Sequence, residues 1–214
     1  MDTKKDDIEN VFKFVGHIDM LVSIVSLRAG IDKCCNPNVM CSNEIIVHKM
    51  RPPLIYDSTP NSIAMTDKSM LLTGSNMSGN TSFIRAIGRN VITGLTINTC
   101  FAESMSFPLL SVFSAIRISD DLLNDKRYYF EEVLTIKEMI IKGENTDKNL
   151  FLLDELFKGT NTVERISAGK AVLSSLSKNN NIALVSKHNI ELADLLLDAY
   201  ERYHFSEIIN ENKI

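Results

Sequence analysis

"LLTGSNMSGNTSFIRAIGRN", residues 71–90, has the outline of a phosphate-binding loop between a buried strand and a helix. Gly74 and Gly79 stand at the spacing of the pattern G-x-x-x-x-G-K-[ST], and Thr81 fills its hydroxyl position. Asn80 occupies the position where that pattern has lysine. Phosphate binding needs glycines for a tight turn, so that backbone N–H groups at a helix N-terminus converge on an anion. Taken alone, the loop fits a βα turn without a ligand equally well.

Apolar strands and helices alternate on both sides of this loop. Near-continuous apolar runs predict buried strands, and the segments between them predict helices. The alternation predicts an α/β fold in which a mostly parallel sheet is covered by helices on both faces. The predicted strands span residues 70–73, 112–118, 149–155 and 181–187, and the predicted helices span 81–94, 129–142, 162–178 and 189–198.

The chain before residue 70 is less regular. Apolar residues at helical spacing predict an amphipathic helix over residues 8–29. Residues 31–66 carry several prolines and asparagines, which predict a connection or a small β-rich segment. Within it, the apolar run "EIIVH" at residues 44–48 is a strand candidate.

Two acidic residues end the predicted strand "NLFLLDE". A nucleotide hydrolase needs a carboxylate at such a strand end to hold the metal, and often a second one to activate water. Asp154 is the candidate Mg²⁺ residue and Glu155 the candidate base. His188 follows the next apolar strand, where a histidine can contact the γ-phosphate or the attacking water. Each feature alone fits a structural role, but together with the loop they favour a nucleotide site.

Composition narrows the classes of function. The chain has 214 residues, 44% of them apolar, and a net charge of −4, whereas a stand-alone nucleic-acid binder usually carries a basic face. No apolar run approaches the roughly 20 residues of a membrane span, and no secretory signal follows the charged N-terminus. We therefore expect a cytoplasmic protein that does not use a membrane. The four cysteines lack the spacing of a zinc site, which favours reduced thiols.

These motifs, in this order, resemble the ATPase domain of the MutS mismatch-repair family, which belongs to the ABC-type P-loop ATPases. The resemblance covers essentially the whole chain, and the likeness is to bacterial MutS-related proteins with a "SDDLL" signature. It implies the end of a lever helix and a connection in residues 1–50, and an ATPase domain, shortened at its C-terminus, in residues 51–214. A fragment, a shortened paralogue and a decayed gene all fit this extent. The strings that carry the resemblance are "LLTGSNMSGNTSFIRAIGRN", "SDDLLNDKRYYFEE", "LFLLDELFKGTNTVER" and "IALVSKHNIELADL".

The resemblance implies a site for ATP or ADP with Mg²⁺. Thr81 and Asp154 would hold the metal, and Glu155 and His188 would be catalytic. Residues 159–161, "GTN", would form a loop facing a partner, because two ATPase domains of this family pack together. The implied partner is a second copy or a related MutS-type chain, and DNA would be reached only through domains that this chain lacks. The residues that would hold the nucleotide are Gly74, Ser75, Asn76, Met77, Ser78, Gly79, Asn80, Thr81 and Ser82.

Three departures from the family pattern affect this site. Asn80 supplies no positive charge, and losing one preorganised donor typically costs about 2.7–4 kcal/mol of transition-state stabilisation. Arg127 stands where the family has a serine, and Lys187 where it has a threonine. These two residues either restore positive charge to the site or reflect neutral drift. The sequence thus favours a MutS-type domain that binds nucleotide and hydrolyses it weakly, with a non-catalytic dimerisation or regulatory module as the alternative.

Overall fold

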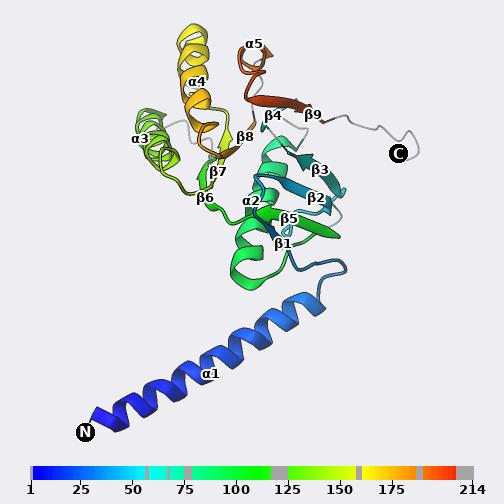
Figure 1. Cartoon of the computed structure of the whole chain (residues 1–214), viewed down its shortest axis with the longest axis vertical. Helices are drawn as coiled ribbons and strands as arrows, with labels where there is room; N and C mark the ends of the chain where they lie inside the picture. Colours follow the sequence, from blue (N-terminus) through cyan, green and yellow to red (C-terminus); the bar gives the residue numbers. More distant parts are fainter. Residues whose placement is uncertain are drawn as a thin grey trace.

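The structure is a computed structural model, and it describes residues 2–55, 58–66, 68–74, 79–116, 125–157, 161–186 and 190–205. Two sheets, four helices that pack on them and a projecting helix, α1, make up this part of the chain (Figure 1). The helices are α1 (Asp2–Ala29), α2 (Asn80–Ile97), α3 (Asp125–Gly143), α4 (Thr162–Leu176) and α5 (Ile190–Asp194).

The larger sheet is parallel, with the strand order β6-β7-β8-β4-β9. Its central strands are apolar throughout because both of their faces are buried, and this confirms the predicted parallel sheet. The predicted strands correspond to four of its members, and the edge strand β9 was not predicted. The strands are β4 (Ser69–Thr73), β6 (Ser111–Ala115), β7 (Asn149–Asp154), β8 (Ile182–Ser186) and β9 (Tyr200–His204).

Successive residues of the central strands point to different cores. Met70 and Leu72 pack with α2 and the smaller sheet, whereas Leu71 packs with residues of α3, α4 and α5. Since side chains alternate along a strand, α2 covers one face of the parallel sheet and the other three helices cover the opposite face (Figure 1).

The smaller sheet has the order β1-β5-β2-β3 and lies over α2. It is mixed, because β2 pairs antiparallel with β3 and β5 while β1 pairs parallel with β5. Strands from both sides of residue 50 share this sheet. The domain boundary predicted at residue 50 stays a prediction. The strands are β1 (Asn38–Met40), β2 (Ile45–Met50), β3 (Asn61–Met65) and β5 (Ser104–Pro108).

The predicted helix over residues 189–198 is wrong in length. Helix α5 ends at Asp194, and turns follow it, in which the N–H groups of Ala199 and Tyr200 both donate to the carbonyl of Leu196. These turns redirect the chain into β9, which pairs parallel with β4. The helix therefore ends before the apolar sequence does, because the chain turns there to pair with the sheet edge.

Helix α1 corrects one expectation about membranes. The segment Lys4–Ala29 is long and apolar enough to cross a bilayer, by length and composition alone. Lys13 and Asp19 interrupt the apolar run in sequence, but they leave the segment as a whole predominantly apolar. A single such helix near an N-terminus is weak support for a span, because signal sequences and core helices have the same composition.

Candidate nucleotide site

The site lies where β4 ends and α2 begins. Gly79 caps the N-terminus of α2 with φ 86° and ψ 12°, and its carbonyl accepts a 2.9 Å hydrogen bond from the N–H of Phe83. A side chain at this left-handed φ would be strained even though open space surrounds the position. The first turn of α2 contains no acidic residue, so its N–H groups and dipole are available to an anion.

A hydrogen bond joins this turn to the end of β7. The hydroxyl of Thr81 donates to Oδ2 of Asp154 at 2.8 Å. Oδ1 of Asp154 is buried and has no hydrogen-bond partner among the described residues. The structure thus brings together the two residues that the sequence assigned to Mg²⁺.

Asn80 is buried at the same turn, with 5% of its surface exposed. Within the described part of the chain, neither Nδ2 nor Oδ1 of Asn80 has a hydrogen-bond partner. A buried amide without partners costs about 1–3 kcal/mol, and buried polar groups are almost always bonded. The position next to Thr81 therefore carries polar groups that a bound ligand could satisfy.

Glu155 follows directly after β7, with its backbone in the left-handed region at φ 48°. Its N–H donates a 3.1 Å hydrogen bond to the carbonyl of Ser186, the last residue of β8. Ser186 itself is buried and pairs in register with Asp154. Strained non-glycine backbone of this kind is concentrated at functional sites, where the surrounding structure holds it in place.

Helix α3 contacts the same loop, which the sequence did not indicate. The N–H of Phe157 donates a 3.0 Å hydrogen bond to Oε1 of Glu132, and the rings of Tyr129 and Phe157 lie 6.4 Å apart. Phe157 also has a left-handed backbone, at φ 57°. Glu132 therefore holds the segment that follows the two acidic residues, although nothing in its local sequence pattern distinguishes it from other helical glutamates.

Other predicted residues have simpler positions. Ser82 is exposed on the first turn of α2, and Gly74 directly follows β4. Asn161 caps α4, because its side chain accepts a 2.9 Å hydrogen bond from the N–H of Glu164. Several predicted residues lie outside the described residues, or have side chains outside them: Ser75, Asn76, Met77, Ser78, Arg127, Gly159, Thr160, Lys187 and His188.

The described residues fit Mg²⁺ and a phosphate group. A hydroxyl and a carboxylate are the oxygen ligands that Mg²⁺ prefers, and this ion usually combines one or two protein groups with phosphates and waters. The described part of the chain contains no cluster of three or more His, Cys, Asp or Glu side chains that could hold a metal. A dedicated all-protein metal site is therefore not found in that part, and the unpartnered Oδ1 of Asp154 suits a shared one.

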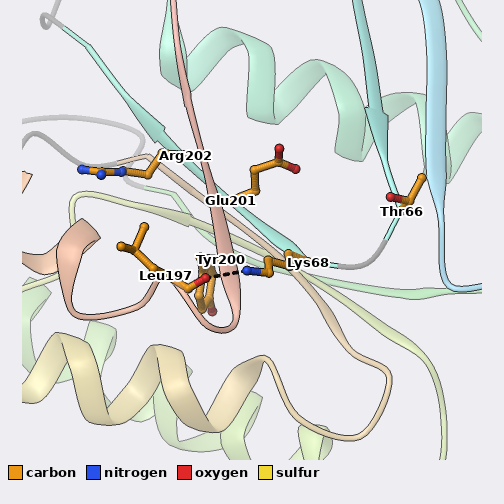
Figure 2. Close-up of a pocket in the computed structure, with 6 residues that line it drawn as sticks. All are labelled: Thr66, Lys68, Leu197, Tyr200, Glu201 and Arg202. Carbon is orange, nitrogen blue, oxygen red and sulfur yellow. Dashed lines mark hydrogen bonds between the residues drawn. The ribbon is translucent and has the colours of Figure 1, made fainter.

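A separate hollow of about 410 Å³ lies at the other end of the parallel sheet (Figure 2). Lys68 and Arg202 line it, but Lys68 donates to the carbonyl of Leu197 and Arg202 pairs with Asp194. Because these interactions already engage both cations, the hollow offers a weaker phosphate site than the start of α2.

Comparison with known proteins agrees with this geometry. Residues 70–213 match the family of MutS domain V. The chain belongs to this family. MutS domain V is a P-loop ATPase domain of the ABC type, so the α/β fold and the loop at the start of α2 agree with membership.

The individual relatives are whole MutS proteins that are distant in sequence and much longer than this chain. The DNA mismatch repair protein MutS of Aquifex pyrophilus is 27% identical over 200 residues, which cover 89% of this chain and 23% of the relative. The protein of the same name from Petrotoga mobilis is 30% identical over 176 residues, covering 78% of this chain and 21% of the relative. The MutS protein of Clostridium botulinum strain Okra is 25% identical over 224 residues, which cover 98% of this chain and 24% of the relative. The chain thus spans about a quarter or less of the curated relatives it matches.

Proposed function

We propose that this MutS-family domain binds ATP or ADP with Mg²⁺ at the start of α2 and hydrolyses ATP weakly. The observation that carries the proposal is a pair of buried, unpartnered polar groups where the first turn of α2 meets the end of β7: the Asn80 amide and Oδ1 of Asp154. Both adjoin a helix N-terminus that lacks acidic residues. A phosphate with its metal ion would satisfy these groups and suit the positive end of the helix dipole.

Each residue then has a distinct part in binding. Thr81 and Asp154 would hold Mg²⁺, which neutralises charge on phosphate oxygens when it is bound. The residues of the loop, Gly74 to Ser82, would surround the phosphates with backbone N–H groups. Glu155 would orient and deprotonate the attacking water, and His188 would contact the γ-phosphate or that water.

Asn80 limits the chemistry of this site. Its Nδ2 can donate a hydrogen bond to a phosphate oxygen, but the amide brings no charge to the β- and γ-phosphates. Binding therefore depends more on Mg²⁺ and the loop backbone than in a site with a lysine. Stabilisation of the transition state should fall by at least the roughly 2.7–4 kcal/mol that one preorganised donor supplies.

The deciding experiment measures nucleotide affinity with and without Mg²⁺, for the natural chain and Asn80→Lys. We expect Mg²⁺-dependent binding by the natural chain and tighter binding by the variant. Binding by neither form would contradict a nucleotide site. Binding by Asn80→Lys alone would instead identify a degenerate site in a non-catalytic module, which is the second candidate function.

Hydrolysis separates a weak enzyme from a module that only binds. We expect slow ATP turnover by the natural chain, rising about 10²–10³-fold in Asn80→Lys. Turnover should disappear in Glu155→Gln while nucleotide binding remains. Turnover that survives Glu155→Gln would point to a contaminating enzyme and would remove Glu155 from its assigned part.

Charge from other segments is a further part of the proposal. Arg127, from a partner chain, and Lys187, in the same chain, would compensate for Asn80. Arg127→Ser or Lys187→Thr should then weaken nucleotide binding, and unchanged affinity in both would favour neutral drift. We also propose cytoplasmic localisation, pairing through the ATPase face, and contact with DNA only through other domains.

A further inference from the structure

Helix α1 exposes apolar side chains from Ile8 to Leu27. It projects away from both sheets (Figure 1), and Phe12, Val15 and Val25 are 73%, 57% and 65% exposed. An isolated helix of this composition is unfavourable in water. Burial of apolar surface contributes roughly 25 cal/mol per Å², and here that surface remains exposed to solvent. The helix therefore requires a covering surface.

Six of the exposed apolar residues of α1 follow a heptad repeat, and further ones flank them at e, f and g positions. Spacings of three and four residues alternate without a break, as in the a and d positions of a coiled coil. A strict repeat of 3.5 residues keeps one seam facing a partner helix in a left-handed supercoil. The seam consists of Ile8, Val11, Val15, Ile18, Val22 and Val25, all of them exposed.

We propose that α1 pairs with α1 of a second copy of this chain as an antiparallel coiled coil. In the antiparallel register centred between Val15 and Ile18, every seam layer is apolar. Val15 then lies opposite Ile18 of the other copy, and Val11 lies opposite Val22. Ile8 lies opposite Val25 in the outer layers.

The residues that flank the seam select this orientation. In the antiparallel register the g positions pair Asp7 with Arg28, and Phe14 with Leu21, each twice by symmetry. A parallel pair would instead place Asp7 against Phe12 and Phe14 against Asp19. Along the e edge the antiparallel register sets Phe12 opposite Asp19, so a charge meets an aromatic ring in either orientation. The preference for the antiparallel pair therefore rests on the g edge, where Asp7 meets Arg28 and Phe14 meets Leu21.

Arg28 also anchors α1 to the folded part of the chain. Its Nε donates to Thr99 at 2.8 Å, and its Nη2 donates to Asn36 and to the carbonyl of Asn98. These bonds hold the base of α1 against the turn after α2, and they leave Nη1 without a hydrogen bond among the described residues.

The length of α1 sets the distance between the two folded parts in such a pair. A helix of 28 residues is about 42 Å long, and the sheets follow its C-terminal end. In an antiparallel pair the folded parts of the two copies lie at opposite ends of the coil. The nucleotide site is not part of this contact, so the pair does not depend on the proposed function.

The decisive comparison uses two matched substitutions in the full chain, without nucleotide and with EDTA. Val15→Glu places a charge in the seam, whereas Met20→Glu places the same charge at an f position of the same helix. Both natural side chains are about equally exposed, at 57% and 50%. By sedimentation equilibrium we expect Met20→Glu to keep the oligomer size of the natural chain and Val15→Glu to form a smaller species. A monomeric natural chain, or equal dissociation by both variants, would overturn the proposal.

The same variants test a bilayer as the alternative cover. Both charges should weaken insertion similarly, so flotation with phosphatidylcholine vesicles should not distinguish them. Flotation of the natural chain that both variants abolish, without any dimer in solution, would overturn the coiled coil in favour of a lipid surface.

The antiparallel orientation is tested by exchanging charges between copies. Asp7→Arg and Arg28→Asp each replace attraction by repulsion within their own dimers, and we expect each to dissociate about tenfold more readily at low salt. Mixing the two variants should restore dimers, because both g pairs are then of opposite charge. Asp6→Arg, at an f position, is the matched control and should leave the dimer unchanged. If mixing fails to restore dimers while Asp6→Arg behaves like the natural chain, the antiparallel register is wrong.

Discussion

The hydroxyl of Thr81 donates a 2.8 Å hydrogen bond to Oδ2 of Asp154 and so joins the first turn of α2 to the end of β7. The other carboxylate oxygen of Asp154 is buried without a partner among the described residues. A carboxylate placed only for stability would be expected to satisfy both oxygens, since an unpaired buried one costs free energy. The arrangement is better suited to holding a cation than to stabilising the fold.

Asp154→Asn should therefore separate binding from stability. We expect the affinity for nucleotide in the presence of Mg²⁺ to fall by about 10–100-fold, the range found when support of a metal is lost. Affinity in EDTA should be unchanged. The midpoint of thermal unfolding without ligand should stay constant or rise, because a buried charge with an unpaired oxygen has been removed. Titration calorimetry and thermal unfolding provide the two measurements.

Asp194→Asn is the matched control for this substitution. Asp194 pairs with Arg202 at the surface, away from the start of α2, and exposed ion pairs contribute little. The affinity of the Asp194→Asn variant for nucleotide should equal that of the natural chain. A loss of stability in Asp154→Asn as large as its loss of affinity would show that Asp154 is a structural residue.

Glu132 should control the loop that follows the two acidic residues. Glu132→Ala removes the acceptor for the N–H of Phe157, a bond to a charged group that is typically worth about 1.5–3 kcal/mol. Hydrogen exchange at the Phe157 amide should accelerate by roughly 10–150-fold, the factor that this free energy corresponds to. Glu132→Gln keeps an acceptor oxygen and should recover most of the protection.

Glu138→Ala tests whether any glutamate of α3 would behave in the same way. Glu138 is exposed on the same helix and does not accept this bond. It should leave exchange at Phe157 unchanged. Equal acceleration in Glu132→Ala and Glu138→Ala would mean that α3 loosens as a whole, rather than that Glu132 holds the loop.

Three of the strands predicted from sequence have both faces buried, whereas the fourth, β6, is an apolar run at a sheet edge. β4, β7 and β8 are continuous apolar runs because helices cover both sides of the parallel sheet. β9, "YERYH", escaped prediction because it pairs with β4 at the sheet edge and only Tyr200 in it is fully buried. β1 and β3 are short and partly exposed, so their pattern carries little signal.

The candidate site could be predicted only where chemistry follows a fixed spacing. The glycines, Thr81 and Asp154 stand in motifs, and the hydrogen bond between the last two shows that the fold brings them together. Glu132 and Ser186 could not be found in this way. Their contacts depend on how α3 and β8 pack against β7, which is a property of the tertiary structure.

A charge cluster on the smaller sheet should make stability depend on pH. Hydrogen bonds from Lys33 and Lys49 lower the pKa of Glu103 from its ordinary value of 4.5 to about 2, and His48 also faces this carboxylate, at 3.4 Å. A carboxyl whose pKa is lower in the folded state stabilises the fold above its unfolded pKa. That contribution is lost as the pH falls from about 4.5 to about 2.

Glu103→Gln should therefore be less stable than the natural chain at pH 6, and the difference should shrink towards pH 2. Urea unfolding at several pH values measures it. Glu144→Gln, at an exposed carboxyl that forms no ion pair among the described residues, should show no such difference at any pH. If the difference in unfolding free energy between Glu103→Gln and the natural chain stays constant over this pH range, the Glu103 carboxylate charge is not its cause.

Two glycines of α2 should differ in their tolerance of alanine. A Cβ at Gly94 would lie 2.7 Å from Cζ of Phe107 and 2.9 Å from Sγ of Cys100, both fully buried. A Cβ at Gly88 would meet mainly the end of the Leu152 side chain, which can change rotamer. Overpacking costs about 1–3 kcal/mol, against a gain in helix propensity of about 0.5–1 kcal/mol. We expect a net loss for Gly94→Ala of about 1 kcal/mol or more by urea unfolding, and a smaller one for Gly88→Ala, because a rigid ring cannot yield as a leucine can. Greater damage from Gly88→Ala would show that Leu152 is held more tightly than Phe107.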